Sequence, residues 1–187
     1  SSLSLKAETI PATDSRVVFV GRTLVDGTTV SFDWTATYFR IAFSGQSLTM
    51  KASDLKFGAA DEEAAAKLHN YYAVWIDSPT SAEPHRIIEV KPGESIIELV
   101  DPNYLKRSRR SVHEVIVQKR TEGEQGRTTI YEFNTNGKFY QATPLKERQL
   151  EFIGDSYTCG YGIDAASRTE RFSPETENAS RSYAAIV

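Results

Sequence analysis

The stretch Tyr-Phe-Arg-Ile-Ala-Phe-Ser-Gly-Gln-Ser-Leu-Thr-Met-Lys-Ala-Ser, residues 38–53, indicates a fold built from short β-strands. Apolar and polar side chains alternate in both halves of the stretch, which is typical of strands that bury one face. The apolar side chains that share a face are Phe39, Ile41 and Phe43 in the first half and Leu48 and Met50 in the second. Ser44–Gln46 is a tight connection between them, so the stretch predicts a β-hairpin.

Similar apolar runs recur along the chain and are separated by turn pairs such as Asp26-Gly27 and Pro92-Gly93. They are Arg16–Gly21, Tyr71–Ile76, Arg86–Val90, Ser95–Val100, Ser111–Arg120 and Thr128–Phe133. Eight to nine short strands at this spacing predict an antiparallel β-sandwich, with a jelly roll as the leading version. Residues 61–68 are rich in Glu and Ala and predict a short helical excursion or an exposed loop.

The pattern of the sequence changes after this region. We interpret residues 1–135 as the β-sandwich (jelly-roll) domain and residues 136–149, which hold Pro144 and several charged residues, as an interdomain linker. Residues 150–187 differ from what precedes them, since they hold an apolar run, a glycine-rich loop, and a helix expected over Ala179–Val187. One strand and one or two helices are too few to bury a core of their own.

The segment Leu150–Gly162 carries the strongest chemical signal. Its apolar start predicts a buried strand that stops at Gly154, and Asp155 and Ser156 follow at once. A serine just past a strand and before a helix is a geometry that nucleophilic hydrolases use. A plain strand-to-helix cap is the structural alternative, since Asp and Ser are common cap residues.

Two other motifs fit this segment poorly. Gly160–Ala165 matches the dinucleotide fingerprint G-x-G-x-x-A, but six residues separate Ile153 from Gly160, whereas the fingerprint begins directly at the strand end. The lipase-type elbow G-x-S-x-G also fails, because Thr158 stands where the second glycine belongs.

Residues 153–162, Ile-Gly-Asp-Ser-x-Thr-x-Gly-Tyr-Gly, closely resemble the first sequence block of the SGNH, or GDSL, hydrolases. Among the SGNH hydrolases, residues 153–162 are most similar to the branch called carbohydrate esterase family 2. Further residues that resemble this branch are Glu177, Asn178 and Ser182–Ala185. The resemblance implies a jelly-roll domain followed by a flavodoxin-like α/β SGNH domain, of which this chain holds only the start. It implies a secreted or periplasmic esterase that deacetylates plant polysaccharides such as xylan or glucomannan, without a metal or cofactor.

The resemblance also implies roles for single residues. Ser156 is the expected nucleophile, and its backbone amide is one expected oxyanion donor. Gly154 permits the turn, and Asp155 braces it through hydrogen bonds to the backbone. Tyr157 is a candidate for the acyl pocket, with core packing as the alternative. Asn178 is a tentative substrate-binding residue, which a helix N-cap explains equally well.

A serine needs a base to take its proton. The family's base is a histidine near the far C-terminus, and its further oxyanion donors, a Gly and an Asn, come from later blocks; none of these is in the chain. His69 and His85 are expected to face solvent, and His113 to be a strand residue. We therefore predict that the missing part of the catalytic domain is a required partner, and that these 187 residues alone are inactive.

The remaining features are ascribed to packing or solvation. We expect most of the aromatic residues that could stack on sugars to pack in the core instead. We also expect Cys159 to be a packing residue. The aromatics are Trp34, Tyr38, Tyr71, Tyr72 and Trp75. Residues 107–110 are a basic run expected to be a solvated loop. A net charge of −3 argues against a nucleic-acid partner, and no apolar run is long enough to span a bilayer.

Two alternative functions stay open at this point. One is a carbohydrate-binding or accessory β-sandwich without catalysis. The other keeps the SGNH enzyme but changes its substrate to a lipid or a thioester. The expected partner of the favoured function is an acetylated polysaccharide or oligosaccharide.

Overall fold

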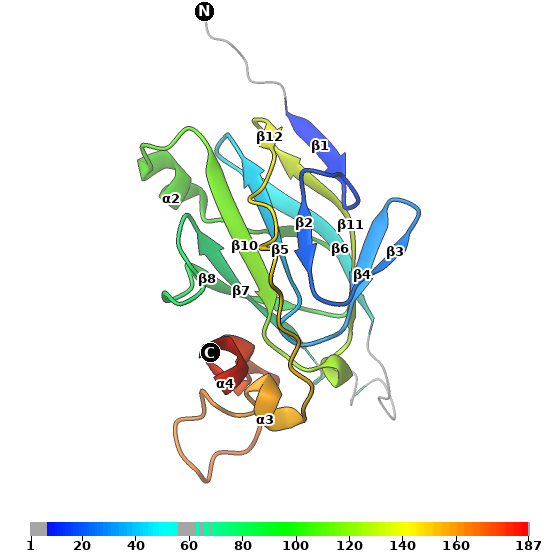
Figure 1. Cartoon of the computed structure of the whole chain (residues 1–187), viewed down its shortest axis with the longest axis vertical. Helices are drawn as coiled ribbons and strands as arrows, with labels where there is room; N and C mark the ends of the chain where they lie inside the picture. Colours follow the sequence, from blue (N-terminus) through cyan, green and yellow to red (C-terminus); the bar gives the residue numbers. More distant parts are fainter. Residues whose placement is uncertain (1–6, 56–62, 64–65, 68, 187) are drawn as a thin grey trace, which may run out of the picture.

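The computed structural model describes residues 7–55, 63, 66–67 and 69–186. Two six-stranded antiparallel sheets form a β-sandwich, with a small C-terminal segment at one end (Figure 1). The first sheet has the order β3 (Leu24–Asp26), β4 (Thr29–Phe32), β11 (Arg127–Thr135), β6 (Leu48–Leu55) and β9 (Gly93–Glu98), and β1 (Glu8–Pro11) pairs with β11. The second has the order β12 (Phe139–Tyr140), β5 (Tyr38–Phe43), β10 (His113–Lys119), β7 (Asn70–Ile76) and β8 (Arg86–Val90), and β2 (Val18–Val20) pairs with β5.

The core lies between the two sheets and is filled by the apolar faces of their strands. Buried and partly exposed side chains alternate along β6 and along β5 as far as Ile41, where Ala42 is also buried. Phe39 and Phe43 are fully buried, as is Leu48. Phe39 packs on Phe133 of the opposite sheet, with the ring centroids 5.1 Å apart. The β-sandwich predicted from the alternation is confirmed.

The hairpin predicted for residues 38–53 is wrong, because β5 and β6 belong to different sheets. β5 pairs with β10, and β6 pairs with β11 and β9. Alternation fixes which face of a strand is buried but not which strand lies beside it. The connection crosses the core edge at Gly45, whose φ of 109° and close approach to the Gly137 backbone leave no room for a side chain.

One helix of the sandwich, α2 (Pro102–Arg107), was not expected from the strand pattern. The Asp101 side chain accepts a hydrogen bond from the Asn103 amide and caps the helix, and Pro102 opens it. α2 buries Leu105 against the core. Of the basic run 107–110, Arg107 ends this helix, and Arg109 and Arg110 are exposed as predicted. Residues 61–68 fall largely outside the described residues.

After β11 the chain stays with the sandwich. β12 pairs with β5 and Ala142 is buried, so the second sheet continues into the range predicted as a linker. The Thr143 amide then donates to the Glu114 carboxylate on β10 at 2.7 Å. From there the chain, yellow to orange in Figure 1, runs past β5 and β10 to the opposite end of the sandwich. The limits proposed for the sandwich, linker and second segment stay predictions.

The buried strand predicted at Leu150–Ile153 is absent. These residues have no strand partner among the described residues, and Leu150 and Ile153 are 77% and 86% exposed. A strand needs a neighbour for its backbone groups and apolar cover for its side chains. Neither is present at this place, so an apolar run that would suit a parallel sheet is left as an exposed extended segment.

The C-terminal segment consists of short helical turns. They are α3 (Ser156–Cys159), two 3₁₀ turns at Pro174–Thr176 and Ala179–Arg181, and α4 (Tyr183–Ile186). The long helix expected over Ala179–Val187 is therefore shorter and broken at Ser182. Figure 1 shows this segment at the end of the sandwich where β10 finishes and β7 begins. None of the described helices is long and apolar enough to cross a membrane.

Candidate active site around Ser156

Ser156 is the first residue of α3, a single helical turn. The carboxylate of Asp155 caps this turn by accepting a hydrogen bond from the Tyr157 amide at 3.0 Å. The Asp155 carbonyl accepts from the Thr158 amide at 2.9 Å. Asp155 thus braces the turn, as expected. Glycine is required at position 154 by the neighbouring Thr158, because a side chain at Gly154 would collide with the Thr158 side chain.

The turn ends at Gly160, which has φ 75° and ψ 36°, the left-handed conformation typical of a helix C-terminus. The backbone of Gly160 also lies against that of Asn178, whose amide donates to the Gly160 carbonyl at 3.1 Å. The Asn178 side chain accepts from the Ser180 amide and so caps the next turn. Its side-chain amide group donates to the Asp164 carboxylate at 2.7 Å, so the Asn178 side chain is hydrogen-bonded within the C-terminal segment.

Arg120, the residue after β10, fastens the C-terminal segment to the sandwich. Its buried guanidinium donates to the Glu177 carbonyl at 3.2 Å and to the Asp164 carboxylate at 2.7 Å. In return, the Arg120 carbonyl accepts from the Ala179 amide at 3.2 Å. Charge-assisted bonds of a buried arginine are among the stronger polar contacts in proteins. The segment that carries Ser156 is therefore held by the exit of a sandwich strand.

The Ser156 hydroxyl is half-buried and donates to the carboxylate of Glu122 at 3.4 Å. Glu122 lies in the loop that follows β10, so the sandwich supplies an acceptor for the hydroxyl of the expected nucleophile. Burial raises the pKa of Glu122, with Glu124 adding to the effect. The contact is long for a hydrogen bond, so it orients the hydroxyl weakly.

Glu177 lies beneath this site and is completely buried. Neither of its carboxylate oxygens makes a hydrogen bond of good geometry within the described residues. Burial raises its pKa to about 8, and the nearby Glu122 backbone amide offsets this only in part. Cys159 faces the same place and is half-buried, so the packing role predicted for it is only partly met. Burial raises the pKa of its thiol.

The three histidines have partners elsewhere. His113 is a buried strand residue, as predicted, and its Nδ1 lies 2.6 Å from the Asp77 carboxylate. His69 contacts Glu89, and His85 accepts from the Asp101 amide. Both are half-buried, so the prediction that they face solvent is only partly met. Within the described part of the chain, Ser156 has no histidine as a hydrogen-bond partner.

The aromatic residues divide between core and surface. Tyr72 and Trp75 are buried, whereas Trp34 is 59% exposed and Tyr38 is half-buried. Tyr71 lines a cleft of about 560 Å³ between β8 and the C-terminal segment, together with Arg120, Asp164 and Glu175. Tyr157 is 85% exposed, so the alternative that placed it in the core is wrong.

Sequence reasoning missed Arg120 and Glu122 altogether. They follow β10 directly, and nothing in a strand-end Arg-Thr-Glu sequence signals contact with a segment more than thirty residues later. Glu177 stood out only by its resemblance to the esterase family. Its complete burial has no sequence signal, because glutamate is among the residues that are rarely buried.

The model of the family described as "Carbohydrate esterase 2 N-terminal" matches residues 19–144. An acetylxylan esterase/glucomannan deacetylase from Cellvibrio japonicus is 31% identical over 156 residues, which are 79% of this chain and 36% of that protein. The cellulase/esterase CelE of Acetivibrio thermocellus is 29% identical over 145 residues, 77% of this chain and 17% of CelE.

Solved structures agree with these relatives. A family two carbohydrate esterase from Cellvibrio japonicus superposes with a TM-score of 0.78 at 23% identity, over 97% of this chain and 48% of that one. One from Clostridium thermocellum, solved with cellohexaose, gives a TM-score of 0.74 at 26% identity, over 91% of this chain and 46% of that one.

The chain spans less than half the length of each of these relatives. The matched region, residues 19–144, coincides with the two sheets from β2 to β12. Because the family model covers more than half of the 187 residues, the chain belongs to carbohydrate esterase family 2, through that family's N-terminal domain.

Proposed function

We propose that this chain is part of an esterase that removes acetyl groups from O-acetylated plant polysaccharides, with Ser156 as the nucleophile. The observation that carries the proposal is the placement of Ser156. Ser156 is the first residue of a capped helical turn, and it is only half-buried. The segment that carries it is held against a domain of carbohydrate esterase family 2. Relatives named acetylxylan esterase/glucomannan deacetylase support xylan and glucomannan as substrates.

The proposed reaction has two steps. The Ser156 oxygen attacks the acetyl carbonyl carbon as a base takes its proton, and the C–O bond to the sugar breaks as the sugar oxygen takes up a proton. Water then attacks the acetyl-enzyme and releases acetate. The Ser156 backbone amide, at the start of α3, is one proposed donor to the oxyanion. The exposed Tyr157 beside it is proposed to border the acyl group.

We infer that the base is a histidine outside this chain. The described histidines are engaged with Asp77, Glu89 and Asp101, and the acceptor that Ser156 has is Glu122. A carboxylate 3.4 Å from the hydroxyl is a weak base compared with an aligned imidazole. The rest of the hydrolase domain is accordingly proposed to complete the site, and residues 150–187 to be the start of its α/β fold.

We further infer that the sandwich is a jelly roll and that the protein acts outside the cytoplasm. The connections β5–β6, β6–β7, β8–β9, β9–β10 and β10–β11 each cross from one sheet to the other, as jelly-roll connections do. The polysaccharide substrates proposed above are too large to enter a cell, which supports a secreted or periplasmic location.

The test compares the natural longer polypeptide with its Ser156→Ala variant and with the isolated 187 residues. A fluorophosphonate probe and acetate release from acetylated xylan are the two measurements. We expect labelling and release by the long wild-type protein only. Labelling that survives Ser156→Ala would refute the nucleophile assignment, and Ser156-dependent turnover by the 187 residues would refute the outside base. A preference for long acyl esters would favour a lipase or thioesterase instead.

A further inference from the structure

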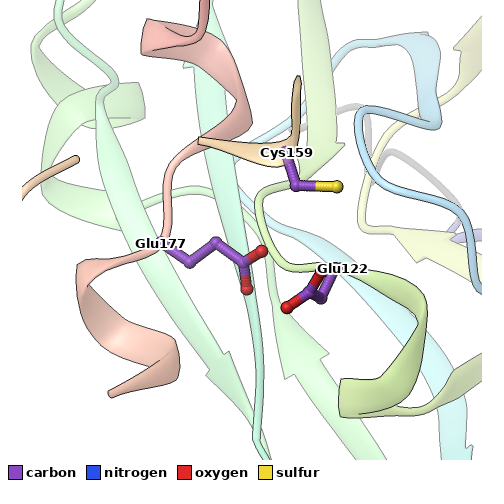
Figure 2. A group of neighbouring side chains, drawn as sticks. All are labelled: Glu122, Cys159 and Glu177. Atoms are coloured by element: carbon purple, nitrogen blue, oxygen red, sulfur yellow. The ribbon is translucent and has the colours of Figure 1, made fainter. Parts of the chain in front are cut away.

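Three potential metal ligands converge from three separate segments beside α3. Glu122 follows β10, Cys159 ends α3, and Glu177 follows the 3₁₀ turn Pro174–Thr176. One ligand atom of each lies within 4.8 Å of the other two. Figure 2 shows the Glu177 carboxylate directed toward that of Glu122, with the Cys159 sulfur beside both. The three side chains therefore share one small space.

Glu177 gives independent evidence that this space is made for a ligand. Its side chain is completely buried, and neither of its oxygens makes a hydrogen bond of good geometry within the described residues, although the Glu122 backbone amide lies close enough to lower its pKa. Buried polar groups in proteins are nearly always paired, because leaving one unpaired costs the full desolvation penalty. A carboxylate buried in this way needs either a proton or a cation, and here it points at two further ligand groups.

The donor set selects the kind of cation. A thiolate with two carboxylates suits Zn²⁺ or a similar thiolate-accepting metal, whereas Mg²⁺ and Ca²⁺ prefer oxygen ligands alone. Bonds of about 2.3 Å to sulfur and about 2.0–2.2 Å to oxygen are normal for Zn²⁺. The ligand atoms lie within 4.8 Å of one another, so to bind one shared ion the side chains would have to rotate toward it.

The surroundings leave the cluster with an excess of negative charge when its groups ionise. The buried Lys119 ammonium is nearby and donates to the carbonyls of Thr121 and Glu122. Glu124 lies beside Glu122 and adds a negative charge. The Thr35 hydroxyl faces the Cys159 thiol. One positive charge against several negative ones favours a divalent cation electrostatically.

We propose that Glu122, Cys159 and Glu177 form a binding site for a divalent cation that accepts a thiolate ligand, with Zn²⁺ as the fitting example. The site joins the sandwich, through Glu122, to the C-terminal segment, through Cys159 and Glu177. A cation bound there acts as a clamp between the two. The proposal does not depend on the esterase reaction, which needs no metal at this place.

The test measures Zn²⁺ binding to the chelator-treated 187-residue chain by titration calorimetry at about pH 8, where the bound metal displaces the protons that remain on its ligands. We expect one Zn²⁺ per chain. Glu177→Gln and Cys159→Ser are each expected to lower the affinity by more than about tenfold, the lower end of what even an outer-shell loss causes. The matched control is Glu175→Gln, two residues away and exposed, which is expected to bind as the wild type does.

Titration with Cd²⁺ gives a second measurement that needs no variant. A cadmium–thiolate bond adds an ultraviolet charge-transfer band, so the wild type is expected to show the band at one equivalent of metal. Absence of the band, absence of Zn²⁺ binding, or binding that Glu177→Gln and Cys159→Ser both leave unchanged would overturn the proposal. None of these results depends on esterase activity, so they are distinct from a failure of the proposed function.

Discussion

Replacing Gly160 by alanine is expected to detach the turn that carries Ser156 from the neighbouring stretch of chain. Gly160 has a φ of 75°, a conformation that costs an alanine about 1 kcal/mol. A β-carbon there would also collide with the Asn178 carbonyl group, whose carbon lies 2.8 Å from its position. Overpacking of this kind costs about 1–3 kcal/mol. The Gly160→Ala penalty is therefore about 2–4 kcal/mol.

Gly162 supplies the control, because it shares the conformation but not the close contact. Its φ is 63°, and no atom lies within 4 Å of a β-carbon built there. Gly162→Ala should therefore cost only the penalty of the left-handed backbone conformation, about 1 kcal/mol. The difference between the two variants measures the Gly160–Asn178 approach by itself.

Native-state hydrogen exchange measures this difference where it arises. The amides of Asn178 and Ala179 donate to Gly160 and Arg120, so their exchange reports the opening of the segment. We expect exchange about 30- to 1,000-fold faster in Gly160→Ala and only about fivefold faster in Gly162→Ala, since about 1.4 kcal/mol is a factor of ten. Amides of β10 should be unaffected. Equal acceleration in both variants would refute the close contact.

Three further predictions concern charged groups. The folded-state pKa of Glu177, about 8, lies above its unfolded value, so its contribution to stability is complete below about pH 4.5 and is lost as the pH rises through 8. Urea unfolding in the presence of a chelator should therefore show that the free energy of unfolding of the wild type falls by about 3 kcal/mol relative to that of Glu177→Gln between about pH 5 and pH 8. Parallel dependences of this free energy on pH in the two proteins would contradict the prediction. Arg120→Ala should destabilise the C-terminal segment by about 2–4 kcal/mol in hydrogen exchange, whereas Arg22→Ala, which breaks an exposed pair, should change it by less than about 0.5 kcal/mol. Asp77→Asn weakens the buried pair with His113 and should lower the unfolding free energy by about 1–2 kcal/mol; an unchanged urea midpoint would speak against that pair.

The sandwich could be predicted from the sequence because its signal is local. The alternation through Phe39, Ile41 and Phe43 fixes which side of β5 is buried, whatever lies beside the strand. Strand partners are not local, and this is why the hairpin prediction failed. A connection as short as Ser44–Gln46 suits a hairpin and a crossing between sheets alike, and the choice depends on β10 and β11, more than sixty residues later.

The candidate site could be predicted only in part, for the same reason. Ser156, Asp155 and Gly160 lie within one short motif, so their turn is visible in the sequence. Arg120 and Glu122 belong to a strand end that shows no pattern of its own, and only the fold brings them to Ser156. The exposed Leu150–Ile153 shows the converse, a local signal for a strand without a neighbour to form it.

Polar contacts from the sandwich support the segment that carries Ser156. Arg120 holds the backbone of the C-terminal segment, Glu122 accepts from the hydroxyl, and Lys119 fixes the loop between them through the Thr121 and Glu122 carbonyls. Lys119 is the last residue of a core strand and the other two follow it closely, so the packed sheets fix the position from which all three extend. A rigid element that ends at a site is how proteins hold reacting groups in place. The β-domain is thereby more than a neighbour of the proposed nucleophile, because a shift of β10 would move the groups that orient it.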